Sequence, residues 1–302
     1  MAIDRVIISN VIGGLGNQMF QYACGLALAN RVGARLALAV DQFAGYSLHQ
    51  GFELPRVFHA EARVASAADL RALLGPWRTP LARRLGGRLL SGSHRAGRIW
   101  FEPRDGTLLP HLIQATGPAY LQGYWQSERY FDDQADAVRH HLRFRDPSAP
   151  ATVDWLRRLQ HDPSFTPVSV HLRRGDYVNS PKNQRIYAEC QPAYYRAAMD
   201  RMSALDARVR FIAFSDDMAW AREVLANRGD QVLYVDHNRG ADSWNDLLLM
   251  SRCRHHIIAN STFSWWGAWL AQTPGQVVFA PRLWFTDASR GADVVPERWQ
   301  RL

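Results

Sequence analysis

Apolar residues along this chain recur in short blocks that predict strands and helices in alternation. Residues 6–12 are apolar and β-branched and are followed by two glycines, as expected for a buried strand. Apolar positions at helical spacing predict a helix over 18–31, and residues 34–40 predict a second strand. A strand, a helix and a strand in this order are typical of a parallel sheet.

The pattern is less regular over residues 62–110. A helix is predicted over 67–74, and a short basic amphipathic segment follows, in which Leu81, Leu85 and Leu89 are spaced by four. We interpret this segment as an ordinary solvated face rather than a helix that contacts a membrane.

Regular alternation returns in the second half. Residues 146–150, Asp-Pro-Ser-Ala-Pro, are the best candidate for a domain boundary. Such alternation indicates a doubly wound parallel sheet. We therefore predict an α/β protein of two Rossmann-like halves, 1–150 and 151–302, with a ligand cleft between them. The predicted helices are 152–160, 192–205, 218–226, 243–253 and 264–271, and the predicted strands are 119–124, 168–172, 210–215, 231–235, 256–259 and 277–280.

Composition adds a positive charge to this picture. The formal net charge is +8, and all but one of the 36 Lys and Arg residues are arginine, the exception being Lys182. Arginine forms bidentate pairs with phosphate, which lysine does not. An anionic partner is expected, and composition alone does not choose among nucleic acid, a membrane surface and a phosphorylated small molecule.

Other features exclude some classes of protein. The odd number of cysteines, three, and the lack of a Cys-x-x-Cys pair argue against a disulfide framework or a zinc site. Neither a signal peptide nor a membrane-spanning run is found. We expect a cytoplasmic protein, at most peripheral on the inner face of a membrane.

A glycine-rich turn follows the first predicted strand. It reads Gly-Gly-Leu-Gly-Asn-Gln over 13–18, and Gly14 and Gly16 would let backbone N–H groups approach an anion. The dinucleotide fingerprint fails, because Met19 occupies its third glycine position. The alternative is a plain tight turn, although Asn17 and Gln18 would suit sugar hydroxyls.

Two arginines follow the strand 168–172. The segment Val-His-Leu-Arg-Arg-Gly-Asp places His171, Arg173, Arg174 and Asp176 where α/β proteins bind ligands. One arginine can grip a diphosphate while the other pairs with Asp176. A fixed guanidinium would stabilise the charge of a departing nucleoside diphosphate without a metal. The alternative is an ordinary surface ion pair.

Two acids end the strand 210–215. Asp216 or Asp217 can accept hydrogen bonds from guanine or bind ribose hydroxyls. A metal-binding acidic pair is the rival interpretation, which the neighbouring arginines oppose. A third is that one of the acids caps the helix that begins near Met218.

Hydroxyl and amide residues follow the strand 256–259 and lead into an aromatic helix. Hydroxyls and helix N–H groups together would make a second phosphate cradle. We expect the tryptophans of this helix to belong to the core. The residues of the predicted cradle are Asn260, Ser261, Thr262, Phe263 and Ser264.

Taken together, these segments resemble the α-1,2-fucosyltransferases of glycosyltransferase family 11. The His-x-Arg-Arg-x-Asp pattern is also similar to that of other fucosyltransferases that use GDP-fucose. The glycine-rich opening and the aromatic helix narrow the resemblance to the α-1,2 group. The matching stretches are GGLGNQMFQYA (13–23), YLQGYWQSERYF (120–131), VSVHLRRGDYV (168–178), FIAFSDD (211–217) and NSTFSWWGAWL (260–270).

The resemblance implies a GT-B-like fold with the donor mainly on the C-terminal half. It implies inverting, metal-independent transfer of fucose from GDP-fucose to the 2-hydroxyl of a galactose-containing glycan. In this transfer Arg174 holds the β-phosphate and Arg173 supports it. No cofactor is expected. His171 and one of the two acids would face the guanosine, Thr262 and Ser264 the phosphates, and Asn17 the fucose or the departing oxygen.

The sequence leaves the proton acceptor open. Direct displacement needs a general base, and Asp176 and His171 are nearby in sequence. Alternatively, the leaving phosphate takes the proton from the acceptor in a loose transition state. The acceptor glycan, whether lipid-linked or free, and the oligomeric state are also open. A fucosyltransferase of another linkage is the first alternative. A nucleic-acid-binding protein is a second, but the arginines are scattered rather than arranged in a basic stripe with aromatics. A nucleotide-sugar oxidoreductase or epimerase is a third, which the failed dinucleotide fingerprint and the single lysine oppose.

Overall fold

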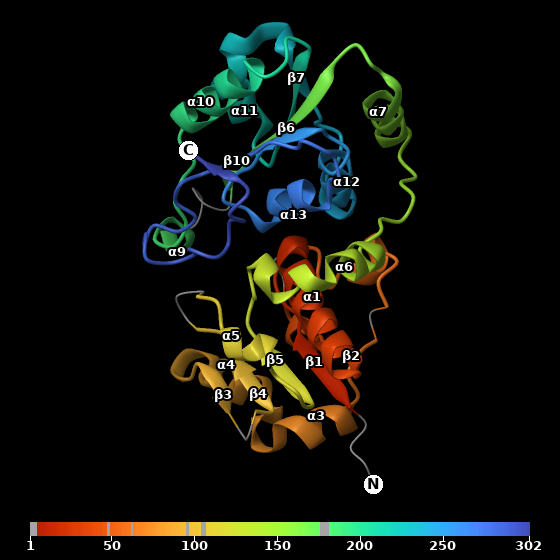
Figure 1. Cartoon of the computed structure of the whole chain (residues 1–302), viewed down its shortest axis with the longest axis vertical. Coiled ribbons are helices and arrows are strands. Elements are labelled where there is room, and N and C mark those ends of the chain that lie inside the picture. The colour runs from red at the N-terminus through yellow and green to blue at the C-terminus, as the bar shows by residue number, and fades with distance from the viewer. Residues whose placement is uncertain (1–4, 47–48, 62, 95–96, 104–106, 176–180) are drawn as a thin grey trace. The chain divides into compact units, whose positions relative to one another are not determined.

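The computed structural model describes residues 5–46, 49–61, 63–94, 97–103, 107–175 and 181–302. The chain forms two compact units, which Figure 1 colours along the sequence. Unit 1 comprises residues 1–145 and 289–296, and unit 2 comprises 146–288 and 297–302. The prediction placed the whole of 151–302 in the second domain and did not include the return of 289–296 to unit 1.

Unit 1 is built on a five-stranded sheet of order β2-β1-β5-β4-β3, parallel except for the β3–β4 pair. Because β1 has β2 on one side and β5 on the other, the chain changes direction across the sheet at β1. The elements are β1 (Val6–Asn10), α1 (Leu15–Val32), β2 (Arg35–Ala39), α2 (Leu54–Val57), α3 (Ala67–Leu74), α4 (Pro80–Leu89), β3 (Gly92–His94), β4 (Ile99–Phe101), α5 (Pro110–Ile113), β5 (Ala119–Gln122) and α6 (Ala135–His141).

Helices cover both faces of this sheet (Figure 1). Alternate residues of β1 point to opposite faces. Val6 and Ile8 pack with Leu73 and Leu74 of α3, and α1 contacts β1 and β2. Fourteen of the 18 residues of α1 are buried, which explains why the sequence in this helix is apolar nearly all round.

Unit 2 is built on a six-stranded parallel sheet of order β11-β10-β9-β6-β7-β8. The order runs outward in both directions from β6, so the topological switch lies between β6 and β9. The elements are α7 (Pro150–His161), β6 (Thr166–Leu172), α9 (Pro181–Gln184), α10 (Pro192–Ser203), β7 (Val209–Ser215), α11 (Met218–Leu225), β8 (Val232–Tyr234), α12 (Trp244–Met250), β9 (His255–Ile257), α13 (Thr262–Leu270), β10 (Val278–Ala280) and β11 (Gln300–Arg301).

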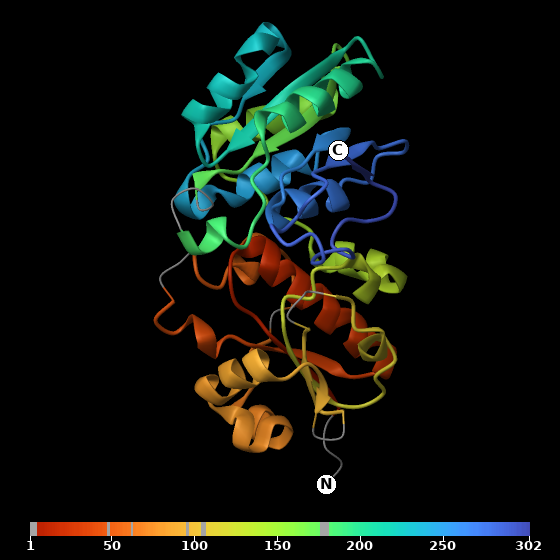
Figure 2. The same ribbon diagram turned by 90° about the vertical axis from the view of Figure 1, so that its left-hand side faces the viewer.

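The helices of unit 2 also form two layers, as Figures 1 and 2 show. Residues of α10 and α11 pack on one side of β6 and β7 through a cluster that includes Met199 and Val224. On the other side, Ile212 and Phe214 of β7 pack with Leu249 of α12 and partly buried residues of α7. Each unit is therefore a three-layer, Rossmann-like sandwich, which confirms the predicted fold class.

In the second half, each predicted helix and strand is confirmed, and its ends lie within three residues of the predicted ones. The three cysteines are buried as free thiols. The tryptophans of α13, Trp265, Trp266 and Trp269, are buried and pack on one another, as expected for the core. In the part of the chain that the structure describes, no helix is both long and apolar enough to cross a bilayer.

Candidate functional site

The turn that follows β6 is held by a carboxylate from the neighbouring strand. The backbone N–H groups of Arg174 and Gly175 donate to Oδ1 and Oδ2 of Asp216, both at 3.0 Å. Asp216 follows β7, which pairs with β6 in parallel register up to Leu172 and Ser215. A Cβ at Gly175 would lie 2.8 Å from Asp216 Oδ2, so glycine lets the carboxylate approach the turn.

The two arginines continue this register as two parallel ion pairs. Arg173 Nη1 lies 3.3 Å from Asp216 Oδ2, and Arg174 Nη1 lies 3.4 Å from Asp217 Oδ2. The side chains are a quarter to a third exposed, so each pair adds less than about 1 kcal/mol to stability. Their role is positional. The predicted partner, Asp176, lies outside the described residues; the partners seen here come from the next strand.

One hydrogen-bond donor of Arg174, its Nε, is not used within the described part of the protein. The Arg174 guanidinium lies over the ring of Trp220, 5.2 Å from the ring centre. Its Nε is buried and has no hydrogen-bond partner among the described residues. A buried donor that the protein does not satisfy is costly, and a phosphate oxygen is the partner that a guanidinium matches best.

Asp217 also caps a helix. Its Oδ1 accepts a hydrogen bond from the N–H of Trp220 at 3.1 Å, in the first turn of α11. The capping interpretation is therefore confirmed for this acid. Both acids are engaged by arginines and backbone N–H groups, and the contact of either one with guanosine stays a prediction.

His171 is a neutral side chain at the end of β6. It is 5% exposed, and its ring lies 6.0 Å from that of Phe263. Burial, reinforced by the neighbouring Arg173, lowers the pKa of His171 to about 3. Its Nδ1 is buried without a hydrogen-bond partner among the described residues. His171 can therefore exchange one hydrogen bond with a ligand, but it is uncharged at neutral pH.

The predicted phosphate cradle, residues 260–264, leads into α13. Ser261 caps this helix by accepting from the N–H of Phe263 at 3.3 Å, and Ser264 Oγ donates to the Ser261 carbonyl at 3.4 Å. Thr262 and Phe263 are partly exposed. The helix N-terminus is thus adjacent to His171, through the Phe263 ring.

Asn260, predicted to bind substrate, is engaged within the protein instead. It is 1% exposed, and its Nδ2 donates to the carbonyls of Ala188 and Trp284. Its Oδ1 accepts from the thiol of Cys190 at 3.5 Å. The side chain therefore ties two loops to the end of β9, and its contact with a substrate stays a prediction.

These residues meet because β9, β6 and β7 are neighbours in one parallel sheet. Their carboxyl ends lie at the same edge, next to the topological switch, where open α/β sheets bind ligands. The structure thus brings three of the four predicted segments together in unit 2. The fourth, the glycine-rich turn, belongs to unit 1.

In unit 1, the glycine-rich turn leads from β1 into α1. Gly13 has a φ of 91°, in the region that favours glycine, and Gly16 is buried in the first turn of the helix. At Gly14, a Cβ would meet the ring of His49 at 3.4 Å. Asn17 is partly exposed, and its Oδ1 accepts from Gln126 Nε2 at 2.9 Å.

Gln18, also predicted to bind substrate, has a supporting position. It is fully buried, and its Nε2 donates to the carbonyls of Gly13 and Gly51 at 2.9 and 2.7 Å. Its Oε1 accepts from the N–H of Glu53 at 2.9 Å. With both ends of the amide engaged, Gln18 fixes the turn to a second loop, and of this pair only Asn17 retains exposure.

Sequence reasoning missed Glu102, which follows β4. Its two oxygens accept from the N–H groups of Tyr124 and Trp125 at 2.6 and 2.7 Å. These bonds hold the loop after β5, in which Trp125 has a φ of 56°. A Cβ at Gly123 would lie 2.4 Å from Glu102 Cβ, which explains the glycine there.

Burial raises the pKa of Glu102 to about 7, although the backbone N–H groups and Arg290 favour its charged form. Because Gln126 extends from the same loop to Asn17, this carboxyl positions the amide pair at the edge of unit 1. No local signal in the sequence marks it: its partners are more than twenty residues away and are backbone groups.

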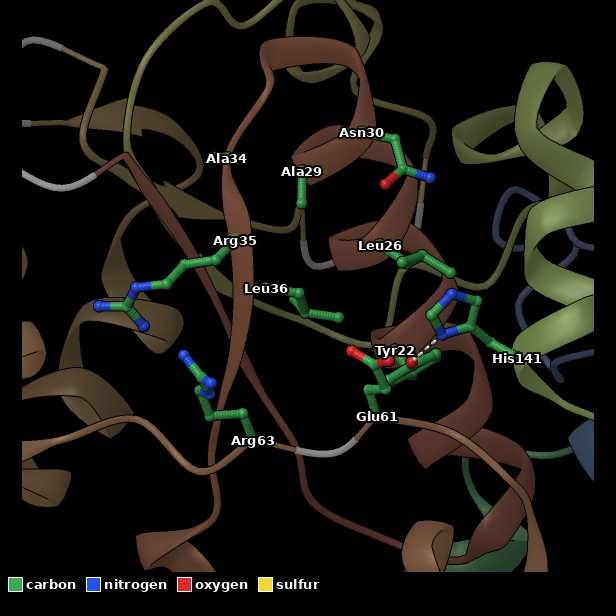
Figure 3. Close-up of a pocket in the computed structure, with 10 residues that line it drawn as sticks. All are labelled: Tyr22, Leu26, Ala29, Asn30, Ala34, Arg35, Leu36, Glu61, Arg63 and His141. Atoms are coloured by element: carbon green, nitrogen blue, oxygen red, sulfur yellow. Dashed lines mark hydrogen bonds between the residues drawn. The ribbon is translucent and has the colours of Figure 1, made fainter.

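Unit 1 also has a cavity of about 320 Å³, away from these residues. Figure 3 shows it between α1, the start of β2 and His141 of α6, with Tyr22 Oη 2.8 Å from His141 Nδ1. Among the described residues, its lining includes none of the predicted site residues. The cavity and the strand-end residues are therefore separate features.

Fold and site together define a GT-B glycosyltransferase: two Rossmann-like halves, with fixed arginines at the switch point of the second. The chain belongs to glycosyl transferase family 11, whose model matches residues 108–299.

Curated relatives include bacterial glycosyltransferases and mammalian galactoside fucosyltransferases. An alpha-1,2-colitosyltransferase of Escherichia coli is 29% identical over 304 residues, which cover 98% of this chain and 99% of the relative. The O-antigen biosynthesis glycosyltransferase WbnK of E. coli is 28% identical, covering 96% and 98%. Galactoside alpha-(1,2)-fucosyltransferase 2 of Rattus norvegicus is 30% identical, covering 87% of this chain and 66% of its own length.

Solved structures share the fold at low sequence identity. The fucosyltransferase NodZ from Bradyrhizobium superposes with a TM-score of 0.56 at 16% identity and covers 91% of this chain and 94% of its own. POFUT1 in complex with GDP-fucose gives a TM-score of 0.52 at 13% identity and covers 91% and 98%. The likeness establishes the architecture.

Proposed function

We propose that this glycosyltransferase moves fucose from GDP-fucose to the 2-hydroxyl of a galactose-containing glycan, with inversion and without a metal ion. The observation that carries the proposal is the arginine turn after β6. Arg173 and Arg174 are aligned by Asp216 and Asp217, and Arg174 Nε is a buried donor without a partner among the described residues.

The chemistry explains why such a donor is useful. When the bond between fucose and GDP breaks, negative charge develops on the β-phosphate. A guanidinium that is already oriented stabilises that charge without reorganising during the reaction. The N-terminus of α13, with Thr262 and Ser264, adds N–H and hydroxyl groups on the neighbouring strand end. Positive charge from the protein then takes the role that a metal plays in other transferases.

We assign the acceptor to unit 1 and the donor to unit 2. The partly exposed amide of Asn17 and its partner Gln126 are uncharged groups that both donate and accept, which suits sugar hydroxyls. Relatives named as galactoside 2-fucosyltransferases support the 2-hydroxyl of galactose as the acceptor.

His171 is a poor candidate for the general base. A pKa of about 3 makes the imidazole too weak to take a proton from a sugar hydroxyl at neutral pH. Of the alternatives that the sequence leaves open, two remain: Asp176, which lies outside the described residues, and the departing phosphate itself.

A second candidate donor is GDP-colitose. The relative named as a colitosyltransferase aligns over nearly the whole of both chains, further than the galactoside fucosyltransferases do. Colitose is fucose without its 3-hydroxyl. A site that hydrogen-bonds this hydroxyl rejects the sugar that lacks it strongly, whereas an apolar site discriminates weakly.

Product analysis tests both candidates together. The protein is incubated with GDP-fucose or GDP-colitose and a panel of galactosides, and the products are examined by NMR. The proposal predicts a fucosyl product linked to O2 of galactose, with inverted anomeric configuration and an unchanged yield in EDTA. If only colitose were transferred, GDP-colitose would take the place of GDP-fucose as the proposed donor. A product linked through another hydroxyl would show that the 2-hydroxyl of galactose is not the acceptor. Loss of activity in EDTA that Mg²⁺ or Mn²⁺ restores would overturn the metal-free mechanism.

A further inference from the structure

Helix α4 presents leucines to solvent on one face. Leu81, Leu85 and Leu89 are 67%, 46% and 79% exposed, and they are three of the seven large apolar residues found exposed in the described part of the chain. Their spacing of four places them in one row along the helix. Arg84 and Arg88, both exposed, lie beside that row and have no carboxylate partner among the described residues.

The opposite face fixes this orientation. Arg83 is fully buried, forms an ion pair with Asp41 and lies 5.4 Å from the centre of the Tyr120 ring. A Cβ at Gly86 would meet the rings of Phe101 and Trp77 at 2.6 and 2.7 Å, so glycine lets the helix lie close to the sheet. The exposed leucines are therefore not a consequence of a loosely placed helix.

Charge in this region is of one sign. From Leu70 to Phe101 the sequence has seven arginines and no Asp or Glu. The acids that flank this stretch are engaged elsewhere: Asp69 pairs with Arg35, and Glu102 accepts from the N–H groups of Tyr124 and Trp125. Asp41, a third acid in contact with α4, pairs with Arg83. The helix begins at a capped N-terminus, where Thr79 Oγ1 accepts from the N–H of Ala82 at 3.2 Å, and this cap stabilises its first turn.

We propose that the row Leu81, Leu85 and Leu89, with Arg84 and Arg88, binds the surface of a bilayer that contains anionic lipids. Leucines enter the boundary between headgroups and acyl chains, and flanking arginines attract lipid phosphates. A nucleic acid would satisfy the arginines and leave the leucines in water. A second copy of the same face would set arginines against arginines. The interpretation of this segment as an ordinary solvated face does not account for the three leucines.

Vesicle co-sedimentation of the full chain tests the proposal. Phosphatidylcholine vesicles with and without phosphatidylglycerol are compared for the native protein and two variants. The triple change Leu81→Ser, Leu85→Ser and Leu89→Ser lowers binding to the anionic vesicles about a hundredfold. The double change Arg84→Gln and Arg88→Gln lowers it about tenfold and removes most of its dependence on salt.

Matched controls separate this surface from general stickiness. Leu205→Ser and Leu283→Ser remove leucines that are 54% and 44% exposed in unit 2, and vesicle binding stays unchanged. All variants keep the native circular dichroism spectrum, since the altered side chains face solvent.

Four results would overturn the proposal. The first is equal binding to neutral and anionic vesicles, or none to either, and the second is native binding by the triple leucine variant. A third is a native oligomer that the leucine changes dissociate, which would assign the face to contacts between copies. The fourth is equally tight binding to an oligonucleotide that the leucine changes leave intact.

Discussion

At the carboxyl edge of the unit 2 sheet, Arg173 and Arg174 face Asp216 and Asp217, whereas at the matching edge of unit 1 the amides of Asn17 and Gln126 face each other. Both edges lie at a topological switch of a parallel sheet. The fold therefore decides where ligands bind, and the residues at the strand ends decide which chemistry is presented there.

The two edges also differ in how their polar groups are supported. In unit 2, Asp216 lies at the edge and orders the turn with its own oxygens. In unit 1, the support is Glu102, a carboxyl placed behind the loop with a pKa raised to about 7. The proposed donor edge thus has fixed charges, and the proposed acceptor edge has neutral groups over a titratable support. The two edges should therefore be separable by mutation and by pH.

The largest effect is expected at Arg174. Arg174→Ala should lower kcat/KM for transfer about a hundredfold to a thousandfold, because it removes a donor aimed at developing charge. The kcat/KM of Arg174→Lys should lie between those of the native protein and Arg174→Ala, because lysine keeps the charge and lacks the planar guanidinium. Steady-state transfer assays measure both.

Arg222→Ala is the matched control. Arg222 forms an ion pair with Asp236 at 2.8 Å and lies 4.2 Å from the centre of the Tyr234 ring, so it has the same kinds of contact in the same unit. Its removal should leave transfer nearly unchanged. Equal losses in the two alanine variants would show that the arginine turn is not special.

The next effect concerns stability and pH. The pKa of Glu102 is raised from 4.5 to about 7 in the folded protein. Protonation therefore favours the folded state, and the contribution of Glu102 is complete below about pH 4.5 and is lost as the pH rises through about 7. Relative to Glu102→Gln, the native protein should lose about 2 to 3 kcal/mol of unfolding free energy across this interval.

Urea unfolding at several pH values measures this difference. Burial also raises the pKa of Asp246 in unit 2 to about 7, but both proteins share it, so it cancels in the comparison. If the unfolding free energies of the native protein and Glu102→Gln depended on pH in the same way, Glu102 would not titrate as proposed.

A smaller effect is expected at the amide pair of unit 1. Asn17→Ala should lower kcat/KM for transfer about tenfold, and Gln126→Ala a fewfold, in line with the loss of one hydrogen bond. GDP affinity, measured by calorimetry, should stay unchanged in both. If Asn17→Ala weakened GDP binding as much as it slowed transfer, the division between donor and acceptor edges would be wrong.

The smallest effect is expected at the glycine of the arginine turn. Gly175→Ala brings a Cβ to 2.8 Å from Asp216 Oδ2, and the carboxylate must shift by a few tenths of an ångström. GDP affinity should fall a fewfold. Gly117→Ala, at a position where a Cβ meets nothing within 4 Å, is the control and should bind GDP normally.

The regular elements follow from the sequence because their apolar blocks are long relative to a strand or a helical turn. The helix 67–74 and the strands of unit 2 are therefore predicted nearly to the residue. The antiparallel pair β3 and β4 is not, since three residues carry no periodicity. The return of 289–296 to unit 1 depends on tertiary contacts that no local pattern records.

Residue type alone was a weaker guide within the site. Gln18 and Asn260 have amides suited to a ligand, and in the structure both bind distant backbone carbonyls, among them those of Gly51 and Trp284, which the sequence does not indicate. The position of Arg173 and Arg174 at the end of β6 follows from the sequence, because they come directly after a buried apolar strand. The ion pairs with Asp216 and Asp217 do not, because the pairing of β6 with β7 cannot be read from either strand alone. The predicted pairing with Asp176 stays a prediction.

A crystal structure of the protein soaked with GDP tests the central claim most directly. The account predicts the diphosphate at the end of β6, with a phosphate oxygen within hydrogen-bond distance of the Arg174 guanidinium and the nucleotide beside His171. A nucleotide bound elsewhere, for example in the cavity next to Tyr22 and His141, with the arginine turn unoccupied, would contradict it.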